Sequence, residues 1–522
     1  MISQVPPHCL AEVKTTPGNV DEILMAARAK IAEEEAAYTK PTFTFDELLE
    51  YVKGGEAGDA KMFVQIFQEK IVKDHAADVW YCYAGHHWEL DELNETLARV
   101  EDLIPHYANG ARQCSKQELK ATRAMDKETA ELAKATREMF LKKITCLQRR
   151  RYRQDVLVLA AAGESSLGIT GKEWDLDPYL LPFKNGVLDL KKRLFRPGQP
   201  SDYIKTVCPT KWQGFDVPAP RWEKFILEIL DGDPDLIAYL KRLLGYGIAG
   251  LTVEHKLPIL WGPEGRNGKG TLLETLNYVL GPLAGPIPGE MLLEQKYPRS
   301  PAAPSPDIMA LRGKRLAWAS ETDEGKNIDA GKVKLLTGGD TLTGRPPFGK
   351  RQVDFPPTHT LMLLTNFRPR VNPRDAALWD RLHLIEFKIS FVDAPAKPNQ
   401  RPRDKYLSIE LKKEASGIIA WLVAGNFEWQ EKGLAPPLQV LGSTKEYRKS
   451  EDSVAQFIEQ CCVVGDGKIA RAKELADAYV DFCKDGGLKA IGKKKFFENL
   501  HGDFLKDRDN KGIYYKELGL QA

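Results

Sequence analysis

The spacing of apolar residues predicts helices in the first half of the chain, short buried strands in the middle and helices again near the end. Apolar side chains recur every three or four residues, as on one face of a helix, in four segments: 20–38, 45–52, 119–158 and 222–250. Continuous apolar runs, typical of strands buried on both faces, follow in four places: 257–261, 315–320, 360–365 and 382–387. Such strands interleaved with helices predict an α/β core with a parallel sheet.

Glycine and proline positions add turns to this pattern. Ala84-Gly85 lies between two aromatic runs in residues 78–90, and Asn185-Gly186 lies between two apolar runs in residues 175–190. Both patterns predict hairpins. Residues 282–306 are rich in Pro, Gly and Ala, which predicts an irregular connection.

The last part of the chain is predicted to be helical and then to end in a hairpin. Residues 407–427 have helical spacing, and residues 453–520 read as three helices followed by a hairpin at 509–512. Three helices and a hairpin suggest a winged-helix-like α+β domain. Three cations open its third helix and are candidates for DNA binding: Lys493, Lys494 and Lys495. Docking of another protein is the alternative role for this domain.

The segment 257–271 carries the strongest candidate chemistry, because a strand, a glycine-rich turn and a helix follow one another there. Glycines let backbone N–H groups converge on phosphate oxygens, and a lysine at the start of the helix can reach the terminal phosphates. The candidate nucleotide-binding residues are Gly262, Gly265, Asn267, Gly268, Lys269, Gly270 and Thr271. The alternative is a glycine-rich turn with a surface lysine.

This loop departs from the usual phosphate-loop pattern at two positions. Five residues, rather than four, separate Gly262 from Gly268, and Gly270 stands where Ser or Thr is expected after the lysine. Thr271 is therefore the nearby hydroxyl for Mg²⁺, one position late. Motifs elsewhere in the chain are therefore needed to establish whether this loop binds a nucleotide.

Polar residues next to the later strands supply what such a loop needs. Glu321 ends one predicted strand and can hold Mg²⁺ and polarise water, and Asn366 follows the next strand and can position that water. Arg381 precedes the last strand, where it could reach the nucleotide of a ring neighbour, and Arg374 is the competing candidate. These residues extend the candidate site beyond the loop.

Basic residues suggest where a nucleic acid could bind. Residues 332–351 carry cations and an aromatic ring near the tip of a loop or hairpin: Arg345, Phe348, Lys350 and Arg351. Cations beside an aromatic ring suit single-stranded nucleic acid, and a basic surface hairpin is the alternative. The basic run at 149–153 is interpreted first as a solvated helix face, with a basic collar around nucleic acid as the alternative.

Composition narrows the class of protein. The formal net charge is only +2 over 522 residues, so a nucleic-acid surface would have to be a local patch or channel. The eight cysteines are scattered without a Cys-x-x-Cys pair, and the adjacent His86 and His87 would point to opposite faces of a strand, so no metal centre built from cysteine or histidine is predicted. No signal pattern or membrane-spanning apolar run occurs, which predicts a cytoplasmic protein without membrane contact.

In combination, these motifs resemble the superfamily 3 helicase part of the primase-helicases of bacteriophages, plasmids and poxviruses, over residues 75–520. The motifs that carry the resemblance are N-G-K-G-T at 267–271, A-S-E at 319–321, L-T-G-G-D at 336–340, T-N at 365–366 and R-L at 381–382, preceded by N-G-V-L-D-L at 185–190 and G-Y-G-I-A-G at 245–250.

The resemblance implies an AAA+ hexameric ring that uses ATP and Mg²⁺ to move on single-stranded DNA, usually 3′ to 5′. It implies that Lys269 binds the β and γ phosphates, that Thr271 is the local hydroxyl and that Glu321 is the Walker B acid. It further implies that Asn366 is the sensor and Arg381 the arginine finger, and it places Arg345 and Lys350 in a pore hairpin.

The resulting expectation is a cytoplasmic replicative helicase of a mobile element that acts on single-stranded and forked DNA. The cytoplasm would be that of a bacterial host if the element is a phage or plasmid. We expect five parts: an N-terminal helical accessory segment (1–74), a helicase-associated collar domain (75–250), the AAA+ core (251–395), a helical lid or linker (396–450) and the winged-helix-like domain (451–522). The segment before the collar is too short for a primase domain, so a separate primase or polymerase would be a partner. The alternatives are a DNA translocase or loader that does not unwind and a nucleotide-gated origin-binding initiator.

Overall fold

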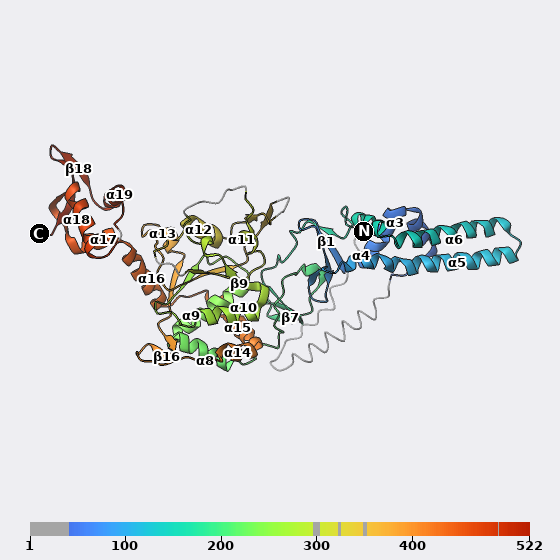
Figure 1. Cartoon of the computed structure of the whole chain (residues 1–522), viewed down its shortest axis with the longest axis horizontal. Coiled ribbons are helices and arrows are strands. Elements are labelled where there is room, and N and C mark those ends of the chain that lie inside the picture. Colours follow the sequence, from blue (N-terminus) through green and yellow to red (C-terminus); the bar gives the residue numbers. More distant parts are fainter. Residues whose placement is uncertain (1–40, 296–302, 322–324, 348–351, 489, 522) are drawn as a thin grey trace.

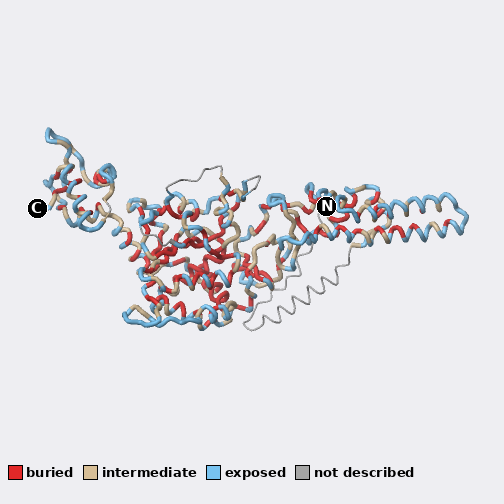
Figure 2. Tube along the Cα trace, in the orientation of Figure 1, coloured by how far each residue is buried: buried red, intermediate tan, exposed pale blue. Residues whose placement is uncertain are grey.

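The computed structural model describes residues 41–295, 303–321, 325–347, 352–488 and 490–521. Three parts follow one another along its long axis: an N-terminal part with two long helices, a central α/β body and a small C-terminal part (Figure 1). Buried residues are densest in the central body (Figure 2), and separate apolar clusters fill the two outer parts. The helix predicted at 20–38 lies outside the described residues.

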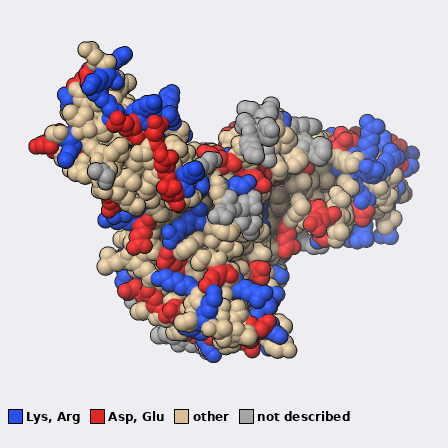
Figure 3. All heavy atoms as spheres, turned by 60° about the vertical axis from the view of Figure 1, so that its left-hand side comes forward, with Lys and Arg blue, Asp and Glu red and all other residues tan. Residues whose placement is uncertain are grey.

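The N-terminal part combines helices with a four-stranded sheet of order β3-β2-β1-β4. Its elements are α2 (Phe45–Lys53), α3 (Gly55–Phe67), β1 (Ile71–Asp74), β2 (Val79–Tyr83), β3 (Trp88–Leu90), α4 (Glu95–Arg99), α5 (Ile104–Arg123), α6 (Lys127–Leu147), α7 (Arg150–Ala160) and β4 (Gly168–Ile169). The predicted helix at 45–52 and hairpin at 78–90 are confirmed. Lys and Arg gather at the outer end of this part (Figure 3).

The helix boundaries predicted at 119–158 are wrong. Three helices occupy the region, and the first begins at Ile104, because a proline in the first turn of a helix needs no backbone hydrogen bond. The chain turns after Arg123, and the side chain of Asp126 then caps α6 by accepting a hydrogen bond from the Thr129 N–H. Helices α5 and α6 therefore form an antiparallel pair that extends away from the rest of the molecule (Figure 1).

The central body is built on a five-stranded sheet in which every neighbouring pair is parallel. In spatial order its strands are β14 (Leu382–Glu386), β8 (Leu257–Trp261), β13 (Thr360–Thr365), β10 (Leu316–Glu321) and β9 (Ala284–Ile287). The four predicted strands and the α/β class are confirmed. The fifth strand, β9, corrects the prediction that 282–306 is wholly irregular; its A-G-P-I sequence gives no strand pattern, but it pairs at the sheet edge, where proline is tolerated.

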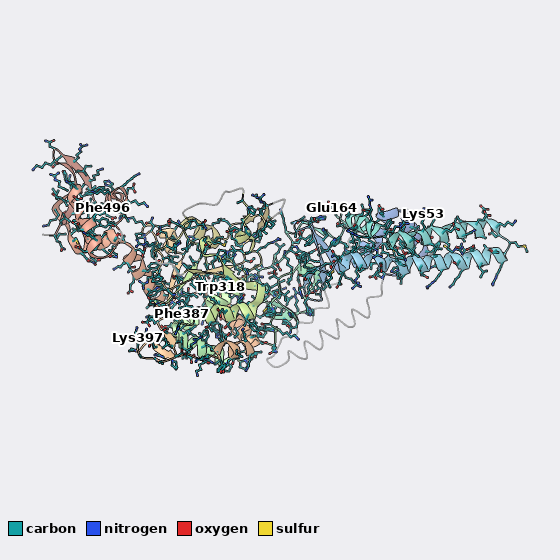
Figure 4. The ribbon with its side chains drawn as sticks, in the orientation of Figure 1. Lys53, Glu164, Trp318, Phe387, Lys397 and Phe496 are labelled. Atoms are coloured by element: carbon teal, nitrogen blue, oxygen red, sulfur yellow. The ribbon has the colours of Figure 1, made fainter. Side chains whose placement is uncertain are left out.

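Helices cover both faces of this sheet, which explains the continuous apolar strands. One face packs on α8 (Pro220–Ile229), α9 (Pro234–Ile248), α10 (Lys269–Leu280), α14 (Leu407–Lys413) and α15 (Ala415–Lys432). Within that cluster, Trp318 of β10 and Phe387 after β14 lie inside the body (Figure 4). The helices predicted at 222–250 and 407–427 are present, each divided in two.

Shorter elements cover the opposite face and flank the body. They are α11 (Pro306–Met309), α12 (Ala330–Thr337), α13 (Ala376–Trp379) and the hairpin of β11 (Leu342–Gly344) with β12 (Val353–Phe355). A second hairpin, β5 (Leu180–Phe183) with β6 (Gly186–Asp189), confirms the turn predicted at Asn185-Gly186 and is extended by β7 (Leu194–Arg196). The pair β15 (Ser390–Val392) and β16 (Gln400–Pro402) follows the last strand of the sheet.

The C-terminal part follows α16 (Leu438–Glu451). Its order is α17 (Ser453–Cys461), β17 (Cys462–Arg471), α18 (Ala472–Asp485), α19 (Lys493–Asp503), β18 (Lys506–Asp509) and β19 (Gly512–Leu520). The predicted three helices and final hairpin are confirmed, and β17 is an additional strand that pairs antiparallel with β19. None of the helices in the described ranges is long and apolar enough to cross a membrane.

Close packing at one glycine fixes the start of α10. Gly268 caps this helix with φ +79°, in the left-handed region that favours glycine. A Cβ atom at Gly268 would lie 2.4 Å from Cγ2 of Ile229 in α8. Two residues later, a Cβ atom at Gly270 would meet nothing within 4 Å. The two glycines therefore have different structural requirements.

We expect Gly268→Ala to destabilise the central body by about 2–4 kcal/mol, because it adds both left-handed strain and an overlap with Ile229. Gly270→Ala is the matched control and should be neutral or slightly stabilising, since helical alanine is favoured over glycine. Calorimetric unfolding should show a transition lowered by several degrees for Gly268→Ala alone. Equal lowering in both variants would contradict this packing.

Candidate functional site

The turn between β8 and α10 is shaped by residues with positive φ. Gly265 has φ +67°, Arg266 +49° and Gly268 +79°, so the backbone curls before the helix begins. A Cβ atom at Gly262 would lie 2.2 Å from Nδ2 of Asn267. Glycine at position 262 therefore lets the Asn267 side chain fold across the inside of the turn.

The side chain of Lys269 is buried inside this turn. Its Nζ donates hydrogen bonds to Gly262 O (3.3 Å), Asn267 Oδ1 (2.6 Å) and Asn366 Oδ1 (3.2 Å). Burial lowers the pKa of Lys269 to about 8, because the charged form loses its hydration. None of these acceptors carries a charge, so the ammonium group is placed to receive an anion.

The parallel register brings the carboxyl ends of the strands together at this edge. Glu321 of β10 lies beside Thr365 of β13, and Thr365 lies beside Trp261 of β8. Because Asn366 follows Thr365 directly, its side chain reaches Lys269 across the sheet. The backbone of Glu321 is at the same edge, and its side chain lies outside the described residues. The structure thus brings together four of the predicted positions: Gly262, Asn267, Lys269 and Asn366.

The first turn of α10 contains the hydroxyl predicted to serve Mg²⁺. Thr271 is partly exposed, and Gly270 beside it is exposed. The N-terminus of a twelve-residue helix offers free N–H groups and a positive dipole end to an anion. In the described part of the chain, no group of three His, Cys, Asp or Glu residues is placed to hold a metal by itself.

The two candidate arginines lie away from this edge. Arg381 precedes β14 at the amino end of the sheet, where its carbonyl oxygen accepts a hydrogen bond from Leu257 N. A five-residue strand spans about 16 Å, so Arg381 and Lys269 belong to opposite edges. Arg374 instead binds the C-terminal part, donating from Nη2 to Asn499 O (2.7 Å) and Asp503 Oδ2 (2.6 Å).

The predicted DNA-binding residues lie in two separate places. Arg345 follows β11 in the hairpin region, and Phe348, Lys350 and Arg351 lie outside the described residues. The lysines at 493–495 are exposed in the first turn of α19. Lys493 lies 3.4 Å from Asp477, an exposed ion pair that contributes little to stability.

Arg368 is a neighbour of the site that the sequence reading missed. Its guanidinium lies 4.1 Å from the centroid of the Trp261 ring, and its Nη2 donates to Glu386 Oε1 at 3.2 Å. Arg368 lies two residues after Asn366 in the sequence T-N-F-R, and a cation so close to the end of a strand is a signal that could have identified it. Its partners come from β8 and β14, and only the parallel register shows that they meet.

A cavity of about 310 Å³ opens beside the same edge. Its lining comes from the turn between α8 and α9, the first part of α9, the end of β14 with the residues after it, and α16: Leu230, Asp231, Asp233, Leu236, Glu386, Lys388 and Gln439. Ser390 Oγ and Phe391 N donate hydrogen bonds to the carbonyl oxygens of Gly265 and Arg266. The segment after β14 therefore fixes the glycine turn next to a polar cavity.

Comparison with known proteins finds a family model that matches part of the chain and several similar viral proteins. Residues 60–231 match the family model described as "D5 N terminal like". The putative helicase L207/L206 of Acanthamoeba polyphaga mimivirus is 27% identical over 398 residues, which cover 73% of this chain and 40% of that protein. The putative helicase 121R of Invertebrate iridescent virus 3 is 25% identical, over 65% of this chain and 39% of that protein.

Other similar proteins include a primase by name and a solved structure. The putative primase C962R of African swine fever virus is 23% identical, over 59% of this chain and 33% of that protein. The apo structure of the NrS-1 C-terminal region has a TM-score of 0.36 and 14% identity, over 59% of this chain and 79% of that chain. The chain spans about two fifths or less of the length of these viral relatives. The chain is thus similar to viral proteins named putative helicase or putative primase, and its residues 60–231 match a D5-type family model.

Proposed function

We propose that this chain is an ATP-driven DNA helicase that acts in replication. The observation that carries the proposal is the buried ammonium of Lys269 at the start of α10, whose contacts within the described part of the chain are all uncharged oxygens. An anion supplies the missing charge, and a triphosphate fits a glycine turn followed by a helix N-terminus. The names of the viral relatives, putative helicase and putative primase, support DNA replication as the process.

Each residue at the carboxyl edge of the sheet has a separate proposed role in ATP binding or hydrolysis. Lys269 binds the terminal phosphates, and backbone N–H groups of residues 262–271 hold the others. Thr271 and Glu321 would hold the Mg²⁺ that accompanies ATP, and this ion would supply charge neutralisation at the phosphates. Glu321 polarises the attacking water, and Asn366 orients it while contacting Lys269. The polar cavity beside β14 is the proposed place for the nucleoside.

The opposite position of Arg381 favours a ring of subunits. An arginine at the amino edge of the sheet cannot serve the loop of its own chain, but it can serve the loop of a neighbour. We propose an AAA+ core assembled as a hexamer, with Arg381 as the arginine finger in trans. Arg374 is engaged by Asp503 and is therefore the weaker candidate.

Single-stranded DNA passes through this proposed ring. The β11–β12 hairpin region supplies Arg345, Phe348, Lys350 and Arg351 as contacts to the strand. The winged-helix-like C-terminal part would use its lysines at 493–495 on forked DNA or on a separate primase or polymerase. Mg²⁺-ATP is the cofactor in each step.

We expect Lys269→Ala to abolish ATP binding, and Glu321→Gln to lower the rate of hydrolysis by about 10²–10⁴-fold while ATP still binds. Lys224→Ala and Glu223→Gln, both exposed on α8, are the matched controls and should hydrolyse ATP normally. ATP hydrolysis and strand displacement should be measured on the same forked DNA. DNA-stimulated hydrolysis without displacement would indicate a translocase, and full function in Glu321→Gln would indicate an initiator.

The pKa of Lys269 predicts a specific pH dependence of ATP binding. In the free protein the ammonium deprotonates near pH 8, whereas bound phosphates favour its charged form. Apparent ATP affinity should therefore fall as pH rises above about 8, by up to tenfold per pH unit. Titration calorimetry at pH 8 in buffers of different ionisation enthalpy should show proton uptake. Binding that releases no buffer-dependent heat would contradict this assignment.

Subunit mixing tests the role of Arg381. Arg381→Ala and Lys269→Ala proteins should each be inactive alone, for different reasons. In a mixed ring, a Lys269→Ala subunit can offer its intact arginine to the intact loop of an Arg381→Ala subunit. Mixing should therefore restore part of the ATP hydrolysis. A mixture no more active than its components would place Arg381 outside the neighbouring site.

A further inference from the structure

The α5–α6 pair forms an arm with one strongly basic face. Helix α5 has twenty residues, about 30 Å of helix, and its outer half extends beyond the other elements of the N-terminal part (Figure 1). Four exposed cations lie along α5 from its middle to its outer end: Arg112, Lys116, Lys120 and Arg123. Lys and Arg gather at this end of the molecule in the space-filling view (Figure 3).

These four cations occupy one side of α5. At 3.6 residues per turn they fall within about 80° around the helix axis. The buried residues of α5 that pack inside the arm, including Ala111, Cys114 and Ala121, lie on the opposite side. The basic face therefore points away from α6, and its four cations are exposed.

Nothing in the described chain neutralises this face. The only carboxylate in α5, Glu118, points elsewhere and pairs with Arg137 of α6 at 2.6 Å. None of the four cations forms an ion pair with another described residue. On α6, by contrast, the exposed lysines at 127, 134 and 142 alternate with Glu131 and Glu138. The net charge of the whole chain is only +2, yet α5 carries a row of four cations that are not paired with described carboxylates.

We propose that the α5 face binds the phosphate backbone of double-stranded DNA. Duplex DNA is a rigid rod with one negative charge per about 1.7 Å, which complements a straight row of cations. Proteins that bind single strands combine cations with aromatic rings on which bases stack, and this strip contains no exposed aromatic side chain. The geometry therefore favours the duplex over the separated strand.

This inference deepens the proposed function, because a helicase with such an arm holds the parental duplex while its ATPase body acts on one strand. Duplex binding by the arm needs neither nucleotide nor hydrolysis. Its failure and the failure of the proposed helicase activity can therefore be told apart. An inactive ATPase site would leave the arm's contribution to duplex binding intact.

The test compares two triple variants of the full chain that lose the same charge. Arg112→Gln with Lys116→Gln and Lys120→Gln removes the α5 strip. Lys127→Gln with Lys134→Gln and Lys142→Gln removes three cations from α6 and is the matched control. All six residues are exposed, and helical circular dichroism checks that the arm stays folded. Binding is measured without nucleotide, on a blunt labelled duplex and on oligo(dT), over a series of salt concentrations.

The α5 variant should bind the duplex about tenfold more weakly or worse at low salt, and the slope of log affinity against log salt should fall by about 0.9 per lost contact. Its binding to oligo(dT) and its ATP hydrolysis without DNA should be unchanged. The α6 variant should bind the duplex nearly as well as the wild type. Equal losses in both variants, an equal loss on oligo(dT), or unchanged duplex binding by the α5 variant would overturn the proposal, and the last result would point to an acidic protein.

Discussion

Lys269 is 6% exposed, and among the described side chains its ammonium group contacts only uncharged oxygen atoms, although burying a charge costs several kcal/mol. The fall of its pKa to about 8 expresses the same cost. The turn must therefore hold this side chain in place by its own packing. Gly262 leaves room for Asn267, Gly268 lets α8 approach, and Asn366 arrives from the neighbouring strand. In the free protein, the residues of this turn surround a positive charge, and the proposed anionic ligand would neutralise it.

The parallel sheet explains which residues can meet this charge. All five strands end at the same edge, so residues following β8, β10 and β13 converge although they are distant in sequence. The same rule keeps Arg381 away, because it precedes its strand. One chain can therefore supply the lysine, the amide and the carboxylate position, but not this arginine. The sheet itself therefore separates Arg381 from the other proposed catalytic residues within one chain.

The sequence predicted correctly those helices and strands in which burial imposes a recognisable spacing of apolar residues. All six residues of β13 are buried, so its apolar run was unambiguous, and Asn185-Gly186 formed the expected turn. Strands β9 and β17 were missed because their sequences, A-G-P-I and C-V-V-G-D-G-K-I-A-R, contain turn-forming residues. Strand β9 is held by pairing at the sheet edge, and β17 is irregular between Val464 and Ile469. Local patterns do not record such long-range pairing.

The candidate site shows the same limit. The order of the strand-end residues predicted that Lys269 and Asn366 share an edge, because parallel strands impose it. Arg368 was missed because its stacking on Trp261 and its contact with Glu386 depend on which strands are neighbours in space. The distribution of charge is another property that the sequence summary does not show. The formal net charge of +2 is a sum over the whole chain, whereas the geometry of α5 places its cations on one side of the helix and its carboxylate, Glu118, on another. The position of a charged surface therefore depends on the direction in which each helix presents its residues, and the net charge of the chain does not show where such a surface lies.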